Sequence, residues 1–152
     1  MVIENSAEFE RFVRKDKWIT AYCDGACFGN PGPMGIGIVI WKDGKKLQEI
    51  SEFIGDGTNN IAEYNAVIRA LQEIKRLAAG SGKQEAVIRS DSELLIKQMN
   101  GEYKVKVRHL KPLKLKIDEL CIGMHVRFEH VPRESNKGAD YLSKKAIEKR
   151  TD

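Results

Sequence analysis

The sequence contains few cysteines and no long hydrophobic run, and each absence excludes a class of protein. No apolar stretch among the 152 residues reaches the roughly 18 residues that a membrane-spanning helix needs. The opening segment, MVIENSAEFERFVRK, carries several acids and lacks the apolar centre of a secretory signal peptide. We therefore expect no membrane segment, and the cytoplasm is the expected compartment.

The cysteines and a glycine-lysine pair also fail to form sites that such residues form elsewhere. Cys23 and Cys27 lie close together, but no histidine is near them, so we expect no zinc site. The odd total of three cysteines is typical of free thiols. The segment GSGK ends like a phosphate-binding P-loop, but Leu77 replaces its first glycine and Gln84 its Ser or Thr. Such a loop is therefore excluded.

Composition and charge indicate one folded domain with a basic C-terminal third. Hydrophobic residues make up 41% of the sequence and charged residues 32%, which suits a single domain with a well-solvated surface. The net charge is +4, and residues 101–152 contain 13 Lys and Arg against 8 Asp and Glu. This excess is compatible with a polyanionic partner and equally with a plain lysine-rich surface.

Hydrophobic periodicity predicts an α/β fold once the order of the elements is considered. Strands are expected at 18–24, at 34–54 as a hairpin turning at Asp43-Gly44, at 85–91 and at 124–132. Helices are expected at about 60–79, 92–101, 110–120 and 136–150. This order predicts a mixed five-stranded sheet, three antiparallel strands and then two parallel additions, with helices packed on it. Residues 1–16 are expected to be an appendage with one short helix, and residues 17–150 the single domain.

Four acids occupy positions at which functional sites are commonly found in such sheets. Asp24 and Asp91 are each the last residue of a predicted strand, and ligand sites lie beyond strand ends in α/β sheets. Glu63 and Asp140 lie early in predicted helices, on faces that otherwise point to the sheet. Helix capping or a favourable helix dipole would explain any one of them. Four together favour a site for a hard cation such as Mg²⁺ or Mn²⁺, and thereby phosphodiester hydrolysis.

The segments YCDGACFGNPGPMGIG, TNNIAEYNAVIRAL, RSDSELLIKQMNG and VPRESNKGADYLSKKA closely resemble the type 1 ribonucleases H. The resemblance extends from about Trp18 to Ala146. It implies a ribonuclease H-like fold and a two-metal endonuclease that cuts the RNA strand of RNA/DNA hybrids and leaves 5′-phosphate and 3′-hydroxyl ends. It also implies Mg²⁺ as cofactor, with Mn²⁺ able to substitute. Four residues match the family's metal-binding carboxylates: Asp24, Glu63, Asp91 and Asp140.

The resemblance further implies a set of substrate contacts. A tight turn after Asp24 would bring Gly25, Ala26 and Cys27 close to RNA 2′-hydroxyls, which distinguish RNA from DNA. Asn30 and Thr58 would hold a DNA phosphate. The remaining contacts are expected from Asn59 and Asn60 in the minor groove and from Asn136, Lys104 and Lys106. Turn formation and helix capping are the alternative roles for the asparagines and Thr58.

The sequence departs from the family pattern at three places. Many members place a histidine in a loop before the last aspartate. His130 has the usual separation from Asp140, but it is expected at a strand end. Arg133, in the segment PRESN, is therefore the favoured auxiliary residue. Asp56 replaces a basic residue found in some relatives. The tryptophan-rich basic protrusion is missing, and GEYKVKVRHLKPLKLK stands in its place, either as a simpler basic handle or as a solvated surface.

Two other functions fit the same residues. One is a non-catalytic module that binds RNA/DNA hybrids, and the loss of an acid that would favour it is not observed. The other is a nuclease with broader activity on double-stranded RNA or on RNA–DNA junctions, which the four carboxylates do not distinguish. No protein partner is implied, and a monomer is expected.

Overall fold

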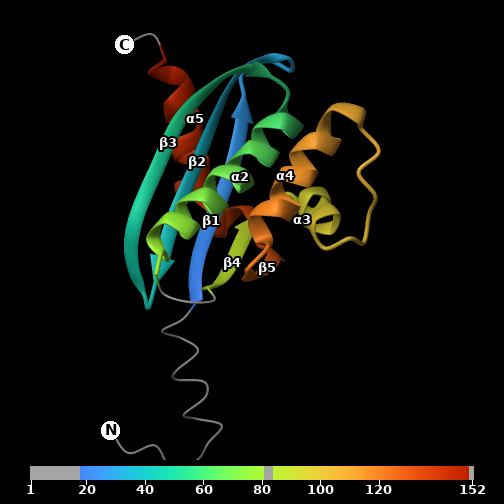
Figure 1. Ribbon diagram of the computed structural model, residues 1–152. Coiled ribbons are helices and arrows are strands. Elements are labelled where there is room, and N and C mark those ends of the chain that lie inside the picture. The colour runs from blue at the N-terminus through green and yellow to red at the C-terminus, as the bar shows by residue number, and fades with distance from the viewer. Residues whose placement is uncertain (1–17, 81–83, 151–152) are drawn as a thin grey trace, which may run out of the picture.

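The computed structural model describes residues 18–80 and 84–150, so the predicted appendage at 1–16 lies outside the described residues. Its five-stranded sheet has the order β3-β2-β1-β4-β5 (Figure 1). The strands are β1 (Trp18–Cys27), β2 (Gly32–Lys42), β3 (Lys45–Gly57), β4 (Gln84–Ser90) and β5 (Met124–His130). β1, β2 and β3 pair antiparallel, whereas β4 pairs parallel with both β1 and β5. The predicted sheet is confirmed.

Helices cover both faces of this sheet. They are α2 (Asn59–Leu77), α3 (Glu93–Met99), α4 (Lys111–Cys121) and α5 (Lys137–Glu148), with short 3₁₀ turns η1 (Arg108–Leu110) and η2 (Arg133–Asn136). α2 packs on β1 and β2, with α4 beside it, and α5 lies on the opposite face against β1, β2 and β3 (Figure 1). None of the described helices combines the length and apolarity needed to cross a lipid bilayer.

The alternating sequence GIGIVI in β2 explains how two helices pack on opposite faces of one strand. Ile36, Ile38 and Ile40 are at most 2% exposed and join the core beneath α2. Gly35 and Gly37 face α5, where a Cβ atom on Gly37 would lie 2.0 Å from the carbonyl oxygen of Ala139. Glycine is therefore required there, because α5 approaches the strand at backbone contact distance.

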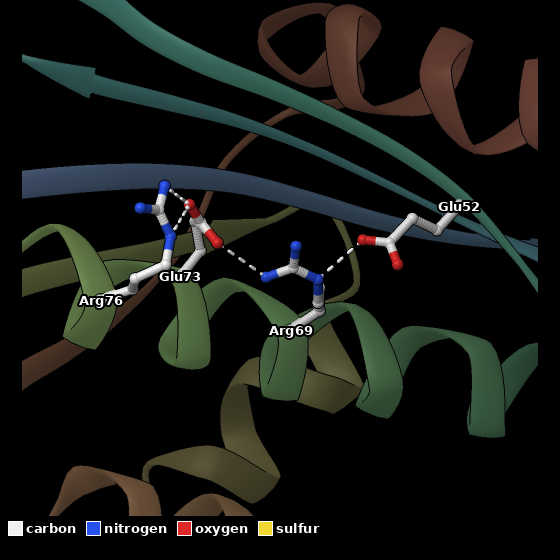
Figure 2. A network of polar contacts seen from close by, with 4 residues as sticks. All are labelled: Glu52, Arg69, Glu73 and Arg76. Carbon is white, nitrogen blue, oxygen red and sulfur yellow. Dashed lines mark hydrogen bonds and ion pairs between the residues drawn. The ribbon is translucent and has the colours of Figure 1, made fainter.

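An ion-pair network around the buried Glu73 links α2 to the sheet (Figure 2). Glu73 is 3% exposed and accepts hydrogen bonds from Arg76 (Nε, 2.8 Å) and Arg69 (Nη1, 2.9 Å). Arg69 also donates through Nε to Glu52 of β3 at 2.7 Å. The hydrogen bonds from Arg76 and Arg69 lower the pKa of Glu73 to about 2. A charge buried in this way is satisfied by two partners, so the network fixes the position of α2 relative to β3.

Two predicted boundaries were wrong because cross-strand pairing extends the strands. β1 does not end at Asp24, since Gly25, Ala26 and Cys27 pair with residues 34–36 of β2. The expected tight turn at 25–27 is therefore strand, and the bend occupies residues 28–31. β3 likewise continues to Gly57, which pairs with Gly32, although the hairpin was expected to end at residue 54. α2 begins at Asn59, which places Glu63 in its second turn.

Candidate active site

The four predicted acids line one hollow of about 330 Å³, although they come from four different elements. Asp24 lies in β1 and Asp91 directly follows β4, whose parallel pairing with β1 brings both to the same edge of the sheet. Glu63 comes from α2 on one face, and Asp140 from the first turn of α5 on the other. The hollow is the place where the two helices and the two strand edges meet.

Gly25 sets how closely β1 approaches α2. A Cβ atom at this position would lie 2.3 Å from the carbonyl carbon of Ala62 and 2.4 Å from the backbone nitrogen of Glu63. The glycine thus lets the strand that carries Asp24 lie against the helix that carries Glu63. The sequence interpretation explained Gly25 by the approach of substrate, and contact between segments far apart in the chain supplies a second reason that it had missed.

Burial and neighbouring acids raise the pKa values of two of the four acids, Asp24 and Glu63. Burial raises the pKa of Asp24 to about 8, helped by a hydrogen bond with the Asp140 carboxyl and by the charges of Asp91, Asp140 and Glu63. Burial also raises the pKa of Glu63 to about 7; a hydrogen bond from Ser92 opposes this rise and the charge of Asp91 adds to it. Clustered carboxyl groups behave in this way when each disfavours the charge of its neighbours. A cation bound in the hollow would instead lower the pKa values of Asp24 and Glu63, because a positive charge favours the ionised carboxylate.

Two cations of the chain contact the acids at the rim. The Lys144 ammonium lies 3.1 Å from Oδ2 of Asp140, and Nε of Arg133 lies 3.8 Å from Oδ2 of Asp91. Both cations line the hollow. Sequence reasoning named Arg133 but missed Lys144, whose spacing of four residues from Asp140 on a predicted helix was the available signal.

The donor set fits a hard divalent cation. Among the described residues that line the hollow, four acids offer carboxylate oxygens, Cys27 offers a thiol, and none is a histidine. Oxygen ligands of this kind suit Mg²⁺ or Mn²⁺. Within residues 18–80 and 84–150, no group of three His, Cys, Asp or Glu side chains lies close enough together to hold one ion. Instead, the Asp140 carboxylate contacts Lys144, and the Asp91 carboxylate contacts Arg133.

Arg133 and His130 differ in their relation to the hollow. Arg133 lies in η2, is exposed and lines the hollow. His130 is the last residue of β5, and its Nε2 lies 3.3 Å from the backbone oxygen of Asp91. His130 is not among the described residues that line the hollow. Its position at the end of a strand is the one that the alternation of β5 predicted.

The predicted substrate contacts lie in several different places. Gly25, Ala26, Cys27 and Asn59 line the hollow. Asn30 and Thr58 cap α2, because Oδ1 of Asn30 accepts from the Asn59 amide at 3.1 Å and Oγ1 of Thr58 from the Ile61 amide at 3.4 Å. Asn30 is exposed and Thr58 is half-buried, so capping and substrate contact are compatible. Asn60 is exposed in the first turn of α2.

Asn136 and the lysines of the basic segment are separate from the hollow. Asn136 is 1% exposed, and its Nδ2 donates to the backbone oxygen of Cys23 at 2.9 Å. It is therefore placed to hold the backbone beside Asp24, and the expectation of a direct substrate contact does not fit this burial. Lys104 and Lys106 are exposed and, with Tyr103, line another hollow of about 550 Å³ next to α3.

Comparison with known proteins gives consistent matches. The family model described as RNase H matches residues 16–148. Ribonuclease HI of Halobacterium salinarum is 37% identical over 132 residues, 86% of this chain and 64% of that protein. A bifunctional protein of Mycobacterium tuberculosis is 38% identical over 130 residues, 82% of this chain. The chain spans only 34% of the length of that mycobacterial relative.

Solved structures show the same similarity. A crystal structure of LC11-RNase H1 in complex with an RNA/DNA hybrid is 43% identical, with a TM-score of 0.84, covering 88% of this chain and 99% of that one. The crystal structure of RNase H1 from Halobacterium salinarum is 38% identical, with a TM-score of 0.78, covering 86% of this chain and 98% of that one.

Proposed function

This chain belongs to the RNase H family, and on that basis we propose that it is a metal-dependent endonuclease that hydrolyses the RNA strand of RNA/DNA hybrids. The matches confirm the resemblance to type 1 ribonucleases H. The observation that carries the proposal is the convergence of Asp24, Glu63, Asp91 and Asp140 on one hollow. The hybrid bound to LC11-RNase H1 supports the choice of substrate.

The four carboxylates would hold Mg²⁺, with Mn²⁺ able to substitute. Two divalent ions supply activation of a water and neutralisation of the leaving oxygen in reactions of this class. The carboxylates would fix the position of that chemistry, because they come from one edge of the sheet and from two helices packed on its opposite faces. The water oxygen would bond to phosphorus as the bond between phosphorus and the 3′-oxygen breaks, and protonation of the 3′-oxygen would leave a 3′-hydroxyl and a 5′-phosphate. Arg133 supplies a positive charge for the phosphate at the rim.

Choice of RNA would depend on the end of β1. Ala26 and Cys27 line the hollow beside Asp24, where small side chains let the strand backbone reach a 2′-hydroxyl. Asn59 and Asn60 at the start of α2 would face the minor groove. Lys104 and Lys106, beside the half-exposed ring of Tyr103, would contact phosphate at a distance from the cleavage point.

The test of the proposal is a panel of labelled duplexes: RNA/DNA, RNA/RNA, DNA/DNA and a DNA duplex with one ribonucleotide. We expect Mg²⁺-dependent cleavage of the RNA strand of the hybrid, loss of cleavage in EDTA, and recovery on adding Mg²⁺. Binding without cleavage would favour the non-catalytic module. Comparable cleavage of RNA/RNA or of the junction would favour the broader nuclease.

The auxiliary residue can be identified by substitution. If Arg133 serves the phosphate, Arg133→Ala lowers kcat about tenfold to a hundredfold, which corresponds to roughly 1.4–2.7 kcal/mol of barrier. KM changes little, because the contact is made mainly in the transition state or at product release. His130→Ala, the matched control from the same region, leaves kcat within about twofold. A large loss of kcat in His130→Ala, with a rate-versus-pH inflection that this substitution removes, would reverse the assignment.

A further inference from the structure

Asp140 carries a cation of its own chain at the site where the proposed function requires a metal. The Lys144 ammonium approaches Oδ2 of Asp140 at 3.1 Å from one turn further along α5. The Lys144 side chain is 53% exposed and that of Asp140 is 39% exposed. The pair thus lies at the open rim of the hollow, where a diffusing cation also arrives.

Of the contacts that Asp140 makes with described residues, the one with Lys144 is the one that a metal ion could replace. Its carboxyl also shares a hydrogen bond with Asp24 in the interior of the hollow. Its backbone oxygen accepts from the hydroxyl of Ser143 at 2.7 Å, within the same helix. Lys144 is long, flexible and half exposed, so its ammonium can leave Asp140 without any movement of the backbone.

We propose that Lys144 is a competing counter-cation: it neutralises Asp140 when no metal is bound and is displaced when a divalent ion binds. The inference rests on the proposed function, because it assumes that Asp140 ligates metal. The ammonium occupies one side of the Asp140 carboxylate oxygen, and its positive charge repels a divalent ion that approaches the same group. Lys144 therefore lowers the affinity of the free protein for metal and stabilises the metal-free state.

The test measures Mn²⁺ binding to the full chain from the electron paramagnetic resonance signal of free Mn²⁺. Lys144→Gln removes the charge and keeps most of the length, and we expect its dissociation constant for Mn²⁺ to fall about fivefold to tenfold. Lys144→Arg keeps the charge and should bind Mn²⁺ like the wild type. Lys145→Gln is the matched control, because Lys145 is adjacent, carries the same charge and lies over the ring of Tyr141 rather than in the hollow.

A second measurement separates competition from a merely structural ion pair. The melting temperature of Lys144→Gln without metal should lie below that of the wild type, while its affinity for Mn²⁺ is higher. In an Asp140→Asn background, Lys144→Gln should have no further effect on Mn²⁺ affinity, because the contested carboxylate is gone.

The outcomes distinguish the two proposals. An unchanged or weaker Mn²⁺ affinity in Lys144→Gln, or an equal gain in Lys145→Gln, would overturn the role of Lys144 while leaving the nuclease intact. A wild-type protein that binds no Mn²⁺ at all, and whose Asp24→Asn variant behaves identically, would contradict the proposed metal-dependent function itself.

Discussion

Asp24→Asn is expected to reduce cleavage of RNA/DNA hybrid at least about a thousandfold, or roughly 4 kcal/mol of barrier, while the protein remains folded. Asp24 is the acid whose pKa responds to all three of the others, so it lies at the centre of the cluster. Replacing its carboxylate by an amide removes a negative charge from a site proposed to hold divalent ions. Single-turnover cleavage with saturating enzyme measures the loss free of any change in binding.

The same substitution should stabilise the metal-free protein, and the effect should depend on pH. The folded-state pKa of Asp24 is about 8, against an ordinary value of 3.8. Between these values the folded state binds a proton that the unfolded state releases, so stability falls as pH rises through this window. Asparagine removes that cost. At pH 8 we expect a gain on the order of 2 kcal/mol, or roughly 4–8 °C in melting temperature, and little gain near pH 4.

Asp43→Asn is the matched control, because it makes the same chemical change at the exposed tip of the β2–β3 hairpin. It should leave both cleavage and melting temperature nearly unchanged. Cleavage by Asp24→Asn at close to the wild-type rate would remove Asp24 from the active site. A melting temperature that falls equally at both pH values would show that the carboxyl group is satisfied in the fold and that the cluster is not strained.

Gly25→Ala should lower both the free energy of unfolding and the rate of cleavage by a large amount. The new methyl group would lie within 2.5 Å of three backbone atoms of Ala62 and Glu63. Backbone atoms cannot rotate away, so β1 and α2 must separate, and overpacking of this kind costs about 3 kcal/mol or more. The separation also draws Glu63 away from Asp24. We expect a hundredfold or larger loss of kcat, since small displacements of catalytic groups have effects of this size.

Urea denaturation and cleavage assays well below the melting temperature would separate the two effects. Gly138→Ala is the control, since its Cβ would meet only a side-chain carbon of Val39, at 3.3 Å. In helix α5 the added methyl group should change stability by no more than about 1 kcal/mol. Wild-type stability in Gly25→Ala would mean that the contact between β1 and α2 is looser than the structure indicates.

The sequence alone determined the order of the elements, and it singled out the four acids that line the hollow. Alternating and helical hydrophobic patterns report which face of each segment is buried, and the sheet of five strands follows from their order. Asp91 was found because it follows a strand, and Asp140 because a helix begins just before it. These are properties of one segment at a time, so a single sequence contains them.

Tertiary structure decided everything that depends on two distant segments meeting. β1 continues past Asp24 because β2 pairs with it, and no local pattern in DGACFGNPG contains that ladder. Gly25 is required because α2 lies against it, and Asn136 is buried because it reaches the backbone of Cys23. Lys144 lines the hollow because the first two helical turns of α5 lie beside it. Such contacts join residues up to 113 positions apart, and their distances and burial are set only when the chain has packed.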